Sequence, residues 1–293
     1  MKATKKPQAA RKPGRKLLDF EEEHGGTRIA QLEKALEDQA GSRRKINLEL
    51  PCADNSFVIG VVGDTHYGSL YEAKDEAEAL YRRFAAEGIT DVFHAGDVLD
   101  GHQMYRGQEF ELHSHGWAKQ RDWFVEHAPR IKGITTHFIT GNHDASMKKA
   151  AGIDVGPELA DRRPDWRFLA EDYGTIDMKT KCGRKFRIAM IHPGGGSAYA
   201  LSYKPQKIVE QIEGGTKPNL LLIGNFHKAE FMPNYRNVAV LQVGCFQFQT
   251  PFMLTKGLAA HVGGWIVQVT VQDRKVLSNS VRAEFIAFYG AQA

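Results

Sequence analysis

The chain has 293 residues, with 39 Lys and Arg against 35 Asp and Glu, and a formal net charge of +4. Its 42% hydrophobic and 25% charged residues are typical of a globular protein and exclude a fibrous or wholly disordered chain. Three cysteines without a CxxC pair do not make a disulfide-stapled domain. The basic N-terminus lacks the apolar stretch of an export signal, and no segment has the roughly 18 apolar residues of a membrane helix. We therefore expect a soluble, cytoplasmic protein with no membrane contact.

The positive charge is concentrated in residues 1–16, which hold seven cations and no acidic residue. Without those seven, 32 cations face 35 acidic residues, so residues 17–293 carry a charge of −3. The segment cannot bury enough apolar surface to offset its ordering entropy, and we expect a disordered tail. Such a tail either solubilises the chain or contacts phosphate groups nonspecifically. Overall charge is thus no evidence for nucleic-acid binding.

The next segment, residues 17–50, is expected to be a helical extension. Ile29, Leu32 and Leu36 recur there at helical spacing, which predicts a short helix that docks a partner or packs on the core. We expect the main domain to cover residues 51–293.

Apolar, β-branched runs predict the strands of this domain. They occupy residues 57–63, 91–96, 134–141, 186–191, 220–224, 238–244 and 264–271. Helical patterns at 73–87 and 117–131 separate the early strands, whereas strands dominate after residue 186. This order predicts an α/β fold with a mixed sheet, or two packed sheets, flanked by helices.

Almost every predicted strand ends in a short loop that carries Asp, His or Asn. Polar groups at the carboxyl ends of neighbouring strands share one crevice, and so many of them would be badly desolvated without cations among them. A pair of metal ions resolves this, and the glycine before most of these loops would permit a sharp turn. The loops are Gly63-Asp64-Thr65-His66, Gly96-Asp97, Gly141-Asn142-His143-Asp144, Ile191-His192-Pro193 and Gly224-Asn225-Phe226-His227.

These motifs resemble the signature of the calcineurin-like metallophosphoesterases, which reads DxH, GD, GNH[DE], H and GHxH. The resemblance spans about residues 56–255 and implies a four-layer α-β-β-α sandwich of two mixed sheets flanked by helices. Short segments are also similar to the exonuclease small subunit of archaeal DNA polymerase D, a subfamily that is itself similar to the nuclease of the double-strand-break repair complex. These segments are 96–101, 105–112, 141–145 and 244–252.

The resemblance also implies roles for individual residues. Two divalent ions, Mn²⁺ first and Mg²⁺, Fe²⁺ or Zn²⁺ as alternatives, would activate a bridging hydroxide for in-line attack on a phosphodiester. His143 would protonate the leaving oxygen, and Asp144 would orient His143 from behind. The implied ligands are Asp64, His66 and His227 for the first ion, Asp97 for both ions, and Asn142 and His192 for the second.

Asn225 departs from the family pattern, which has a histidine at this position. An amide oxygen is a weaker ligand than imidazole for transition metals, so a ligating Asn225 would give a loose second site that favours Mn²⁺ or Mg²⁺ over Zn²⁺. Alternatively, Asn225 does not ligate, and water completes the site or the site stays empty.

Three further polar residues lie near the motifs. His94 precedes Asp97 by three positions within a predicted strand, and we interpret it as a core histidine that supports the loop. His102 could touch substrate or replace a missing ligand. Asp100 either fixes its own loop or contacts substrate or metal.

Two other features allow a binding role or a structural one. The glycines of residues 194–197 could form an anion-binding nest of backbone amides or a flexible hinge. The alternating aromatic residues Phe246, Phe248 and Phe252 favour a buried anchor over a base-stacking platform.

Three functions follow from this interpretation. The first is a dimetal phosphodiesterase that acts on nucleic acid, as a DNA exonuclease or nuclease. The second applies the same chemistry to a small nucleotide or a phosphoprotein. The third is a non-catalytic accessory protein with a replication or repair partner.

Overall fold

The computed structural model describes residues 47–196, 198–271 and 280–289. The expected tail at 1–16, and the expected helical extension up to residue 46, lie outside the described residues. Residues 47–50, at the end of that extension, form part of a strand in which Leu48 is buried. Among the described residues, no helix has the length and apolar character needed to span a membrane.

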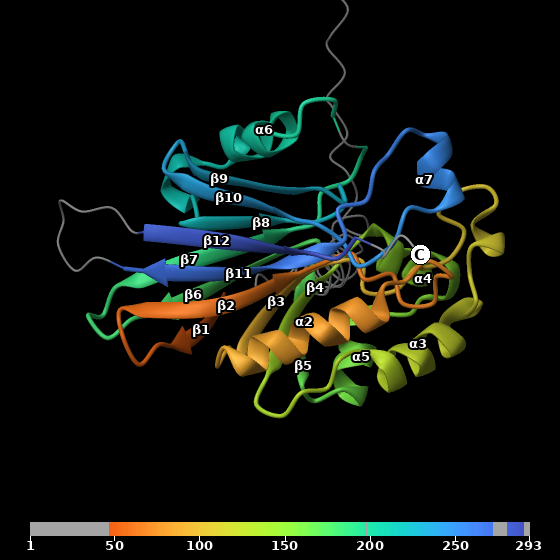
Figure 1. The fold of residues 1–293 in the computed structure, drawn as a ribbon, viewed down its shortest axis with the longest axis horizontal. Helices are drawn as coiled ribbons and strands as arrows, with labels where there is room; N and C mark the ends of the chain where they lie inside the picture. The colour runs from red at the N-terminus through yellow and green to blue at the C-terminus, as the bar shows by residue number, and fades with distance from the viewer. Residues whose placement is uncertain (1–46, 197, 272–279, 290–293) are drawn as a thin grey trace, which may run out of the picture. The chain divides into compact units, whose positions relative to one another are not determined.

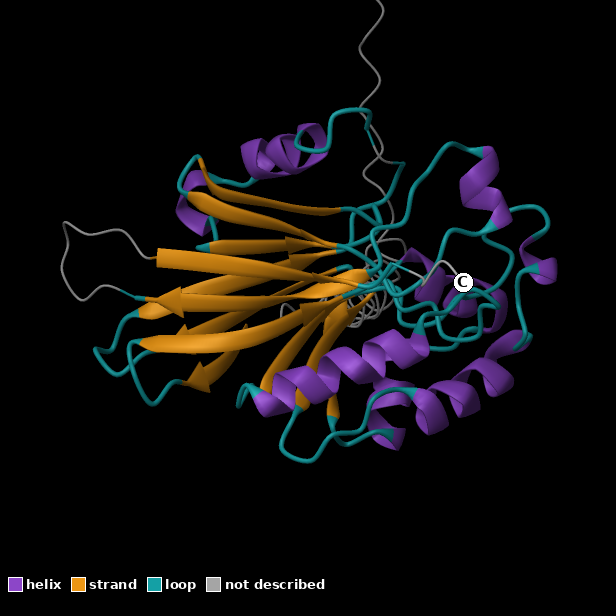
Figure 2. Cartoon of the chain, in the orientation of Figure 1, coloured by secondary structure: helices purple, strands orange, loops and turns teal. Residues whose placement is uncertain are grey.

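Twelve strands of the described chain form two mixed sheets of six (Figures 1 and 2). The first sheet has the order β1 (Asn47–Pro51), β6 (Tyr173–Lys179), β7 (Lys185–Ile191), β8 (Leu220–Ile223), β10 (Val238–Val243) and β9 (Ala229–Tyr235). The second has the order β12 (Ser280–Ala287), β11 (Gly263–Thr270), β2 (Ser56–Val62), β3 (Asp91–Ala95), β4 (Thr135–Thr140) and β5 (Trp166–Glu171). Strands β2 to β5 are parallel, as are β7, β8 and β10, so their carboxyl ends lie at one edge of each sheet.

The main apolar core lies between the two sheets. Successive side chains of a strand point to opposite faces, so Phe93 and Ala95 of β3 face this core while Val92 packs on the outer face with α2. Strands buried on both faces need continuous apolar sequence, which explains why the runs at 57–63 and 238–244 identify strands.

Helices cover the outer faces of both sheets and complete four layers (Figure 2). On the second sheet, α2 (Lys74–Ala86) buries Ala77, Leu80, Tyr81 and Phe84, the stripe expected from its helical spacing. The predicted α-β-β-α architecture is therefore confirmed. The other elements are η1 (Gln108–Phe110), α3 (Gly116–His127), α4 (Asn142–Ala151), α5 (Val155–Arg162), α6 (Tyr203–Gln211) on the first sheet, η2 (Gly214–Thr216) and α7 (Pro251–Thr255).

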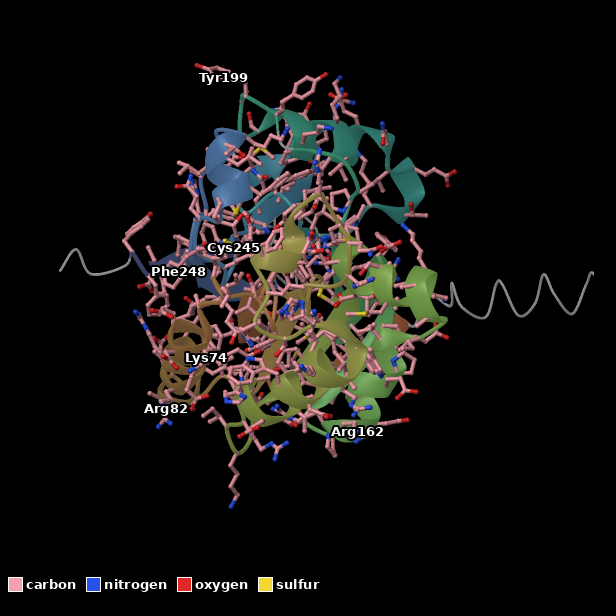
Figure 3. The ribbon with its side chains drawn as sticks, turned by 90° about the vertical axis from the view of Figure 1, so that its right-hand side faces the viewer. Lys74, Arg82, Arg162, Tyr199, Cys245 and Phe248 are labelled. Atoms are coloured by element: carbon pink, nitrogen blue, oxygen red, sulfur yellow. The ribbon has the colours of Figure 1, made fainter. Side chains whose placement is uncertain are left out.

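The outer surfaces of these helices are polar. Arg82 of α2 and Arg162 of α5 project away from the fold (Figure 3). Helix α3 ends at His127 rather than at the expected residue 131, because Ala128 precedes Pro129 and takes an extended conformation.

Candidate metal centre

The predicted ligands meet at the carboxyl edges of the two sheets, where the connecting loops gather beside the strands (Figure 1). In the second sheet, loops after β2 and β3 supply Asp64, His66 and Asp97, and the first residue of α4, just after β4, is Asn142. In the first sheet, loops after β7 and β8 supply His192, Asn225 and His227. All seven predicted ligand residues therefore lie at the carboxyl edges of the sheets, the region that the positions of these residues at strand ends predict.

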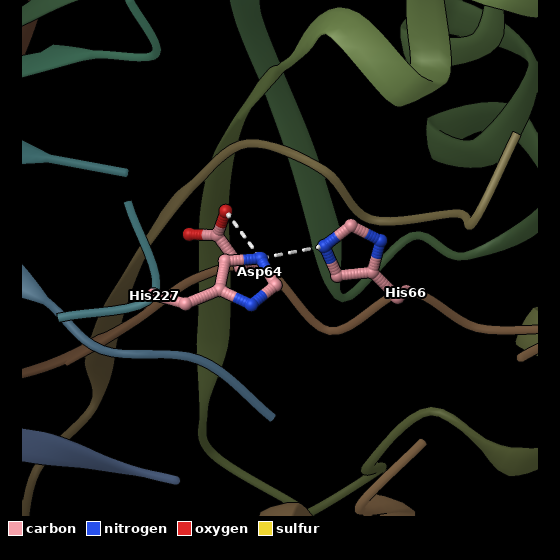
Figure 4. Close-up of side chains that lie close together, drawn as sticks. All are labelled: Asp64, His66 and His227. Atoms are coloured by element: carbon pink, nitrogen blue, oxygen red, sulfur yellow. Dashed lines mark hydrogen bonds and ion pairs between the residues drawn. The ribbon is translucent and has the colours of Figure 1, made fainter. Parts of the chain in front are cut away.

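Asp64, His66 and His227 form one group of donor atoms (Figure 4). Nε2 of His227 lies 3.1 Å from Nε2 of His66 and 3.5 Å from Oδ1 of Asp64. Metal–nitrogen bonds of about 2.1 Å place neighbouring ligands about 3 Å apart, so this spacing suits a shared cation. Within the part of the chain that the structure describes, the buried atoms Oδ2 of Asp64 and Nδ1 of His227 have no hydrogen-bond partner. The group fits a cation site.

Asp97, Asn142 and His192 form a second group. Nε2 of His192 lies 3.0 Å from Oδ2 of Asp97 and 3.1 Å from Oδ1 of Asn142. Oδ2 of Asp97 also lies 4.0 Å from Nε2 of His66, so this carboxylate stands between the two groups. The donors of both groups are imidazole nitrogens and carboxylate or amide oxygens, a set that suits a pair of divalent ions.

Hydrogen bonds fix two of the imidazole rings. Nδ1 of His66 lies 3.0 Å from Oδ1 of Asp100, and Nδ1 of His192 lies 2.8 Å from the carbonyl oxygen of Ala95. A proton on Nδ1 leaves the lone pair of Nε2 available to bind a metal ion in the centre.

Asp100 is held in turn by the side-chain amides of Gln108 and Gln247. Both glutamines lie in the segments 105–112 and 244–252 named above, but no role was predicted for them from the sequence.

Five of the site residues adopt the left-handed backbone conformation. The φ values are 50° for Asp64, 47° for His66, 52° for Asp97, 74° for Asn225 and 52° for His227. This conformation is uncommon for residues other than glycine and concentrates at functional sites, where the surrounding structure holds it.

The glycines beside these ligands act differently from our expectation at three of four positions. Gly63, Gly141 and Gly224 are not in the left-handed region and instead make room. A Cβ on Gly141 would overlap the carboxylate of Asp97, and one on Gly224 would lie 2.8 Å from Nδ1 of His192. Only Gly96, with a φ of 96°, supplies the turn that we expected, and the other sharp turns belong to the ligand residues themselves.

Burial makes the charges of the centre costly. It raises the pKa of Asp64 well above its ordinary value and lowers the pKa of His227. Burial alone would lower the pKa of His192, but the charge of Asp97 and a hydrogen bond to it raise that pKa to about 10. Burial alone would raise the pKa of Asp97, but nearby histidines, His192 first, bring it below its ordinary value. Divalent cations would stabilise so many buried charges.

His143 lies at the rim of the centre, as the motif suggested, but Asp144 does not orient its ring. Nδ1 of His143 donates to the carbonyl oxygen of Asp100 at 2.6 Å, which turns Nε2 outward. The Asp144 carboxylate instead accepts the backbone N–H groups of Val98, Leu99 and Gly141 at 2.9–3.1 Å. It therefore joins the Asp97 loop to the start of α4, and the expectation that it holds His143 from behind is corrected.

Asn225 uses its amide nitrogen within the protein. Nδ2 donates to the carbonyl oxygens of Pro193 at 2.6 Å and Gly195 at 2.8 Å, and the backbone N–H donates to Oδ1 of Asp64 at 2.9 Å. Only the amide oxygen is left to face a cation. The residue therefore fastens the 193–195 loop to the centre whether or not it ligates.

His94 and His102 lie outside the two ligand groups. His94 is buried, its Nε2 lies 3.0 Å from Oγ1 of Thr65, and burial lowers its pKa to about 3. This is the arrangement expected for a core histidine. His102 does not line the pocket described next, although its backbone N–H reaches Oγ of Ser146.

A pocket of about 240 Å³ opens beside the centre. Part of its lining consists of ligand residues and His143. The rest is largely apolar and includes Tyr105 and two residues of α7. Its lining is His66, Asp97, Tyr105, His143, Gly195, Gly196, Asn225, Phe226, His227, Gln247, Thr250, Phe252, Met253, Leu258 and Ala259.

Most of the chain is similar in sequence to known proteins. A family model described as calcineurin-like phosphoesterase matches residues 57–238. The DNA polymerase II small subunit of Halobacterium salinarum is 34% identical over 246 residues, which cover 72% of this chain and 47% of that protein. The same subunit from a second strain of this organism matches equally. The chain thus spans about half the length of the curated relatives it matches.

The matches among solved structures have low sequence identity and TM-scores below 0.5. A predicted phosphoesterase from Streptococcus pneumoniae is 13% identical, with a TM-score of 0.38 over 80% of this chain and 94% of that one. GAP50 of Plasmodium is 10% identical, with a TM-score of 0.42 over 81% and 90%. Zinc-bound Vps29 from Entamoeba histolytica is 14% identical, with a TM-score of 0.37 over 80% and 100%.

Proposed function

The chain belongs to the calcineurin-like phosphoesterase family, and we propose that it is a dimetal-dependent phosphodiesterase that hydrolyses DNA, as an exonuclease or nuclease. The observation that carries this proposal is the convergence of the two donor groups, with Asp97 between them, beside His143. The 34% identity to a DNA polymerase small subunit supports DNA as the substrate and a replication or repair protein as a partner.

We assign the residues of the centre to two cation positions. Asp64, His66, His227 and Asp97 would hold the first ion, and Asp97, Asn142 and His192 the second, with the Asn225 amide oxygen as a weaker additional ligand. When bound, such ions lower the pKa of water and neutralise charge that develops on the phosphate. Mn²⁺ is the proposed ion because carboxylate and amide oxygens supplement the imidazoles.

His143 would act on the leaving oxygen. The carbonyl oxygen of Asp100 accepts a hydrogen bond from Nδ1 of His143, so Nε2 is the ring nitrogen left for the substrate, and it can donate a proton when the ring is in its imidazolium form. The backbone N–H of His143 also donates to Oδ1 of Asp97 at 2.8 Å, which fixes this imidazole relative to the carboxylate between the two groups. His143 would therefore both donate the proton, through its ring, and hold the ligand Asp97 in place, through its backbone N–H.

The decisive experiment incubates labelled single- and double-stranded DNA with the full chain and Mn²⁺. We expect cleavage by the wild type and a loss of about 100- to 10,000-fold in His143→Ala, the range typical of general acid catalysis. His115→Ala is the matched control, because His115 is exposed and lies outside the pocket. Absence of cleavage by the wild type, or equal cleavage by His143→Ala, would refute the proposal.

One observation favours a small nucleotide ester as a second candidate substrate. The pocket of about 240 Å³ is small compared with the roughly 300–1,000 Å³ of drug-sized ligand sites and cannot admit a duplex. Rapid hydrolysis of chromogenic diesters without DNA cleavage would favour this candidate. Metal binding with no turnover of either substrate, together with co-purification with a larger polymerase chain, would instead indicate a non-catalytic subunit.

A further inference from the structure

Tyr105 and Phe252 form a stacked aromatic pair in the lining of the pocket. Their ring centroids are 4.0 Å apart and their planes differ by 16°. Both side chains are partly exposed, so Phe252 is not the buried anchor expected from the sequence, and both line the pocket that contains His66, Asp97 and His143. They come from segments almost 150 residues apart, so the pair exists only in the folded chain.

A buried carboxylate holds the two aromatic residues together. The hydroxyl of Tyr105 donates to Oε2 of Glu111 at 2.7 Å, and the backbone N–H of Phe252 donates to Oε1 of Glu111 at 3.0 Å. Glu111 is only 8% exposed. These two hydrogen bonds fix the position of both residues before any ligand arrives, which reduces the entropy lost on binding.

The surroundings of the pair suit a planar apolar group. Met253 and Leu258 also line the pocket, and Nζ of the exposed Lys256 lies 6.0 Å from the Phe252 ring centroid. The neighbouring Gln247 donates its amide hydrogens to Ser69 and Asp100. Its donors are therefore occupied, and the wall offers stacking more than hydrogen bonding to a base edge.

We propose that the Tyr105–Phe252 pair is a stacking platform for the base of the terminal nucleotide of a single strand whose phosphate lies at the metal centre. The inference rests on the proposed phosphodiesterase function and specifies its substrate as an unpaired strand end. The pocket is too small for paired bases, and aromatic stacking accepts every base because each has a flat π face. The platform therefore selects nucleotides over other phosphodiesters without selecting a sequence.

The kinetic test compares two chromogenic esters that share one leaving group, thymidine 5′-(p-nitrophenyl phosphate) and methyl p-nitrophenyl phosphate, with the full chain and Mn²⁺. We expect the wild type to prefer the thymidine ester by roughly 10- to 100-fold in kcat/KM, the range that stacking of one base provides. Phe252→Leu and Tyr105→Leu should each reduce this ratio at least fivefold. Phe110→Leu is the matched control, because Phe110 is 80% exposed and lies outside the pocket.

A binding measurement separates failure of the platform from failure of the proposed function. In titration calorimetry with Mn²⁺, deoxyadenosine 5′-monophosphate should bind at least tenfold more tightly than deoxyribose 5-phosphate, and Phe252→Leu should remove most of the difference. This holds whether or not the chain cleaves DNA. Equal binding of the two ligands, or a ratio of esters or ligands that is unchanged in both folded variants, would overturn the platform while leaving phosphodiesterase activity intact.

Discussion

Nδ1 of the His66 imidazole lies 3.0 Å from Oδ1 of the Asp100 carboxylate, and both side chains are buried. This pair fixes which ring nitrogen of His66 faces His227 and the proposed cation. Asp100 receives two further hydrogen bonds from Gln108 and Gln247, so segments around residues 66, 108 and 247 meet at a single carboxylate.

Asp100→Asn should weaken metal binding about 10- to 100-fold without unfolding the chain. The amide keeps the size of the side chain but no longer fixes the tautomer or increases the basicity of His66. The measurement is Mn²⁺ affinity by competition with a chromophoric chelator. Asp75→Asn, on the exposed start of α2, is the control and should bind as the wild type does. Equal affinity in the two variants would contradict the orienting role.

Asn225→His should tighten binding of the second ion, most for Zn²⁺, because imidazole is a stronger ligand than an amide oxygen for this metal. Elemental analysis after dialysis should show one retained ion per wild-type chain and two per variant chain. The substitution also removes the hydrogen bonds to Pro193 and Gly195, so Asn225→Ala serves as the control for loop release. Two tightly held zinc ions in the wild type would contradict this prediction.

Arg163→Met should lower the free energy of unfolding by about 3 kcal/mol or more. The guanidinium is fully buried, pairs with Asp165 and donates to the carbonyl oxygens of Ala128 and Pro129, which join α5 to the end of α3. Urea unfolding measures the change. Arg162→Met, next to it on the exposed face (Figure 3), should change stability by less than about 0.5 kcal/mol. Similar losses for both variants would refute the argument.

Asp91→Asn should destabilise the fold in a pH-dependent way. Burial alone would raise the pKa of Asp91, but hydrogen bonds from His137 and Thr90 outweigh it and lower the pKa. The ionised carboxylate is therefore favoured in the folded state, and its contribution is present above the unfolded pKa of about 3.9 and is lost as the pH falls through the lower folded value.

We expect a loss of about 1 kcal/mol near pH 7 that shrinks below about pH 4. Urea unfolding in the presence of a chelator measures it across this range, with the exposed Asp161→Asn as the control. A difference between wild type and Asp91→Asn that stays constant down to pH 3 would show that the hydrogen bonds do not act through ionisation.

The sequence was sufficient to predict the two sheets, their helical layers and the region of the metal ligands. Buried strands appear in the sequence as apolar runs, and the carboxyl ends of parallel strands lie at the same edge of a sheet. Five of the described strands escaped prediction. Strands β1, β5, β9 and β12 lie at sheet edges and carry exposed or half-buried residues, and β6 lacks a continuous apolar run because its sequence is YGTIDMK. The Asp100, Gln108 and Gln247 contacts and the Tyr105–Phe252 stack could not be predicted, since each joins segments whose proximity depends on the complete fold.

The proposed ion ligands come from both sheets: Asp64, His66, Asp97 and Asn142 follow strands of one, and His192 and His227 follow strands of the other. Bound ions would therefore act as a staple across the sandwich, and any sliding of one sheet against the other would break the coordination shell. Cation binding and unfolding would then be linked equilibria, and the free energy of unfolding would grow with the logarithm of the free ion concentration. The melting temperature of this protein would therefore rise with the concentration of free divalent metal ions in solution.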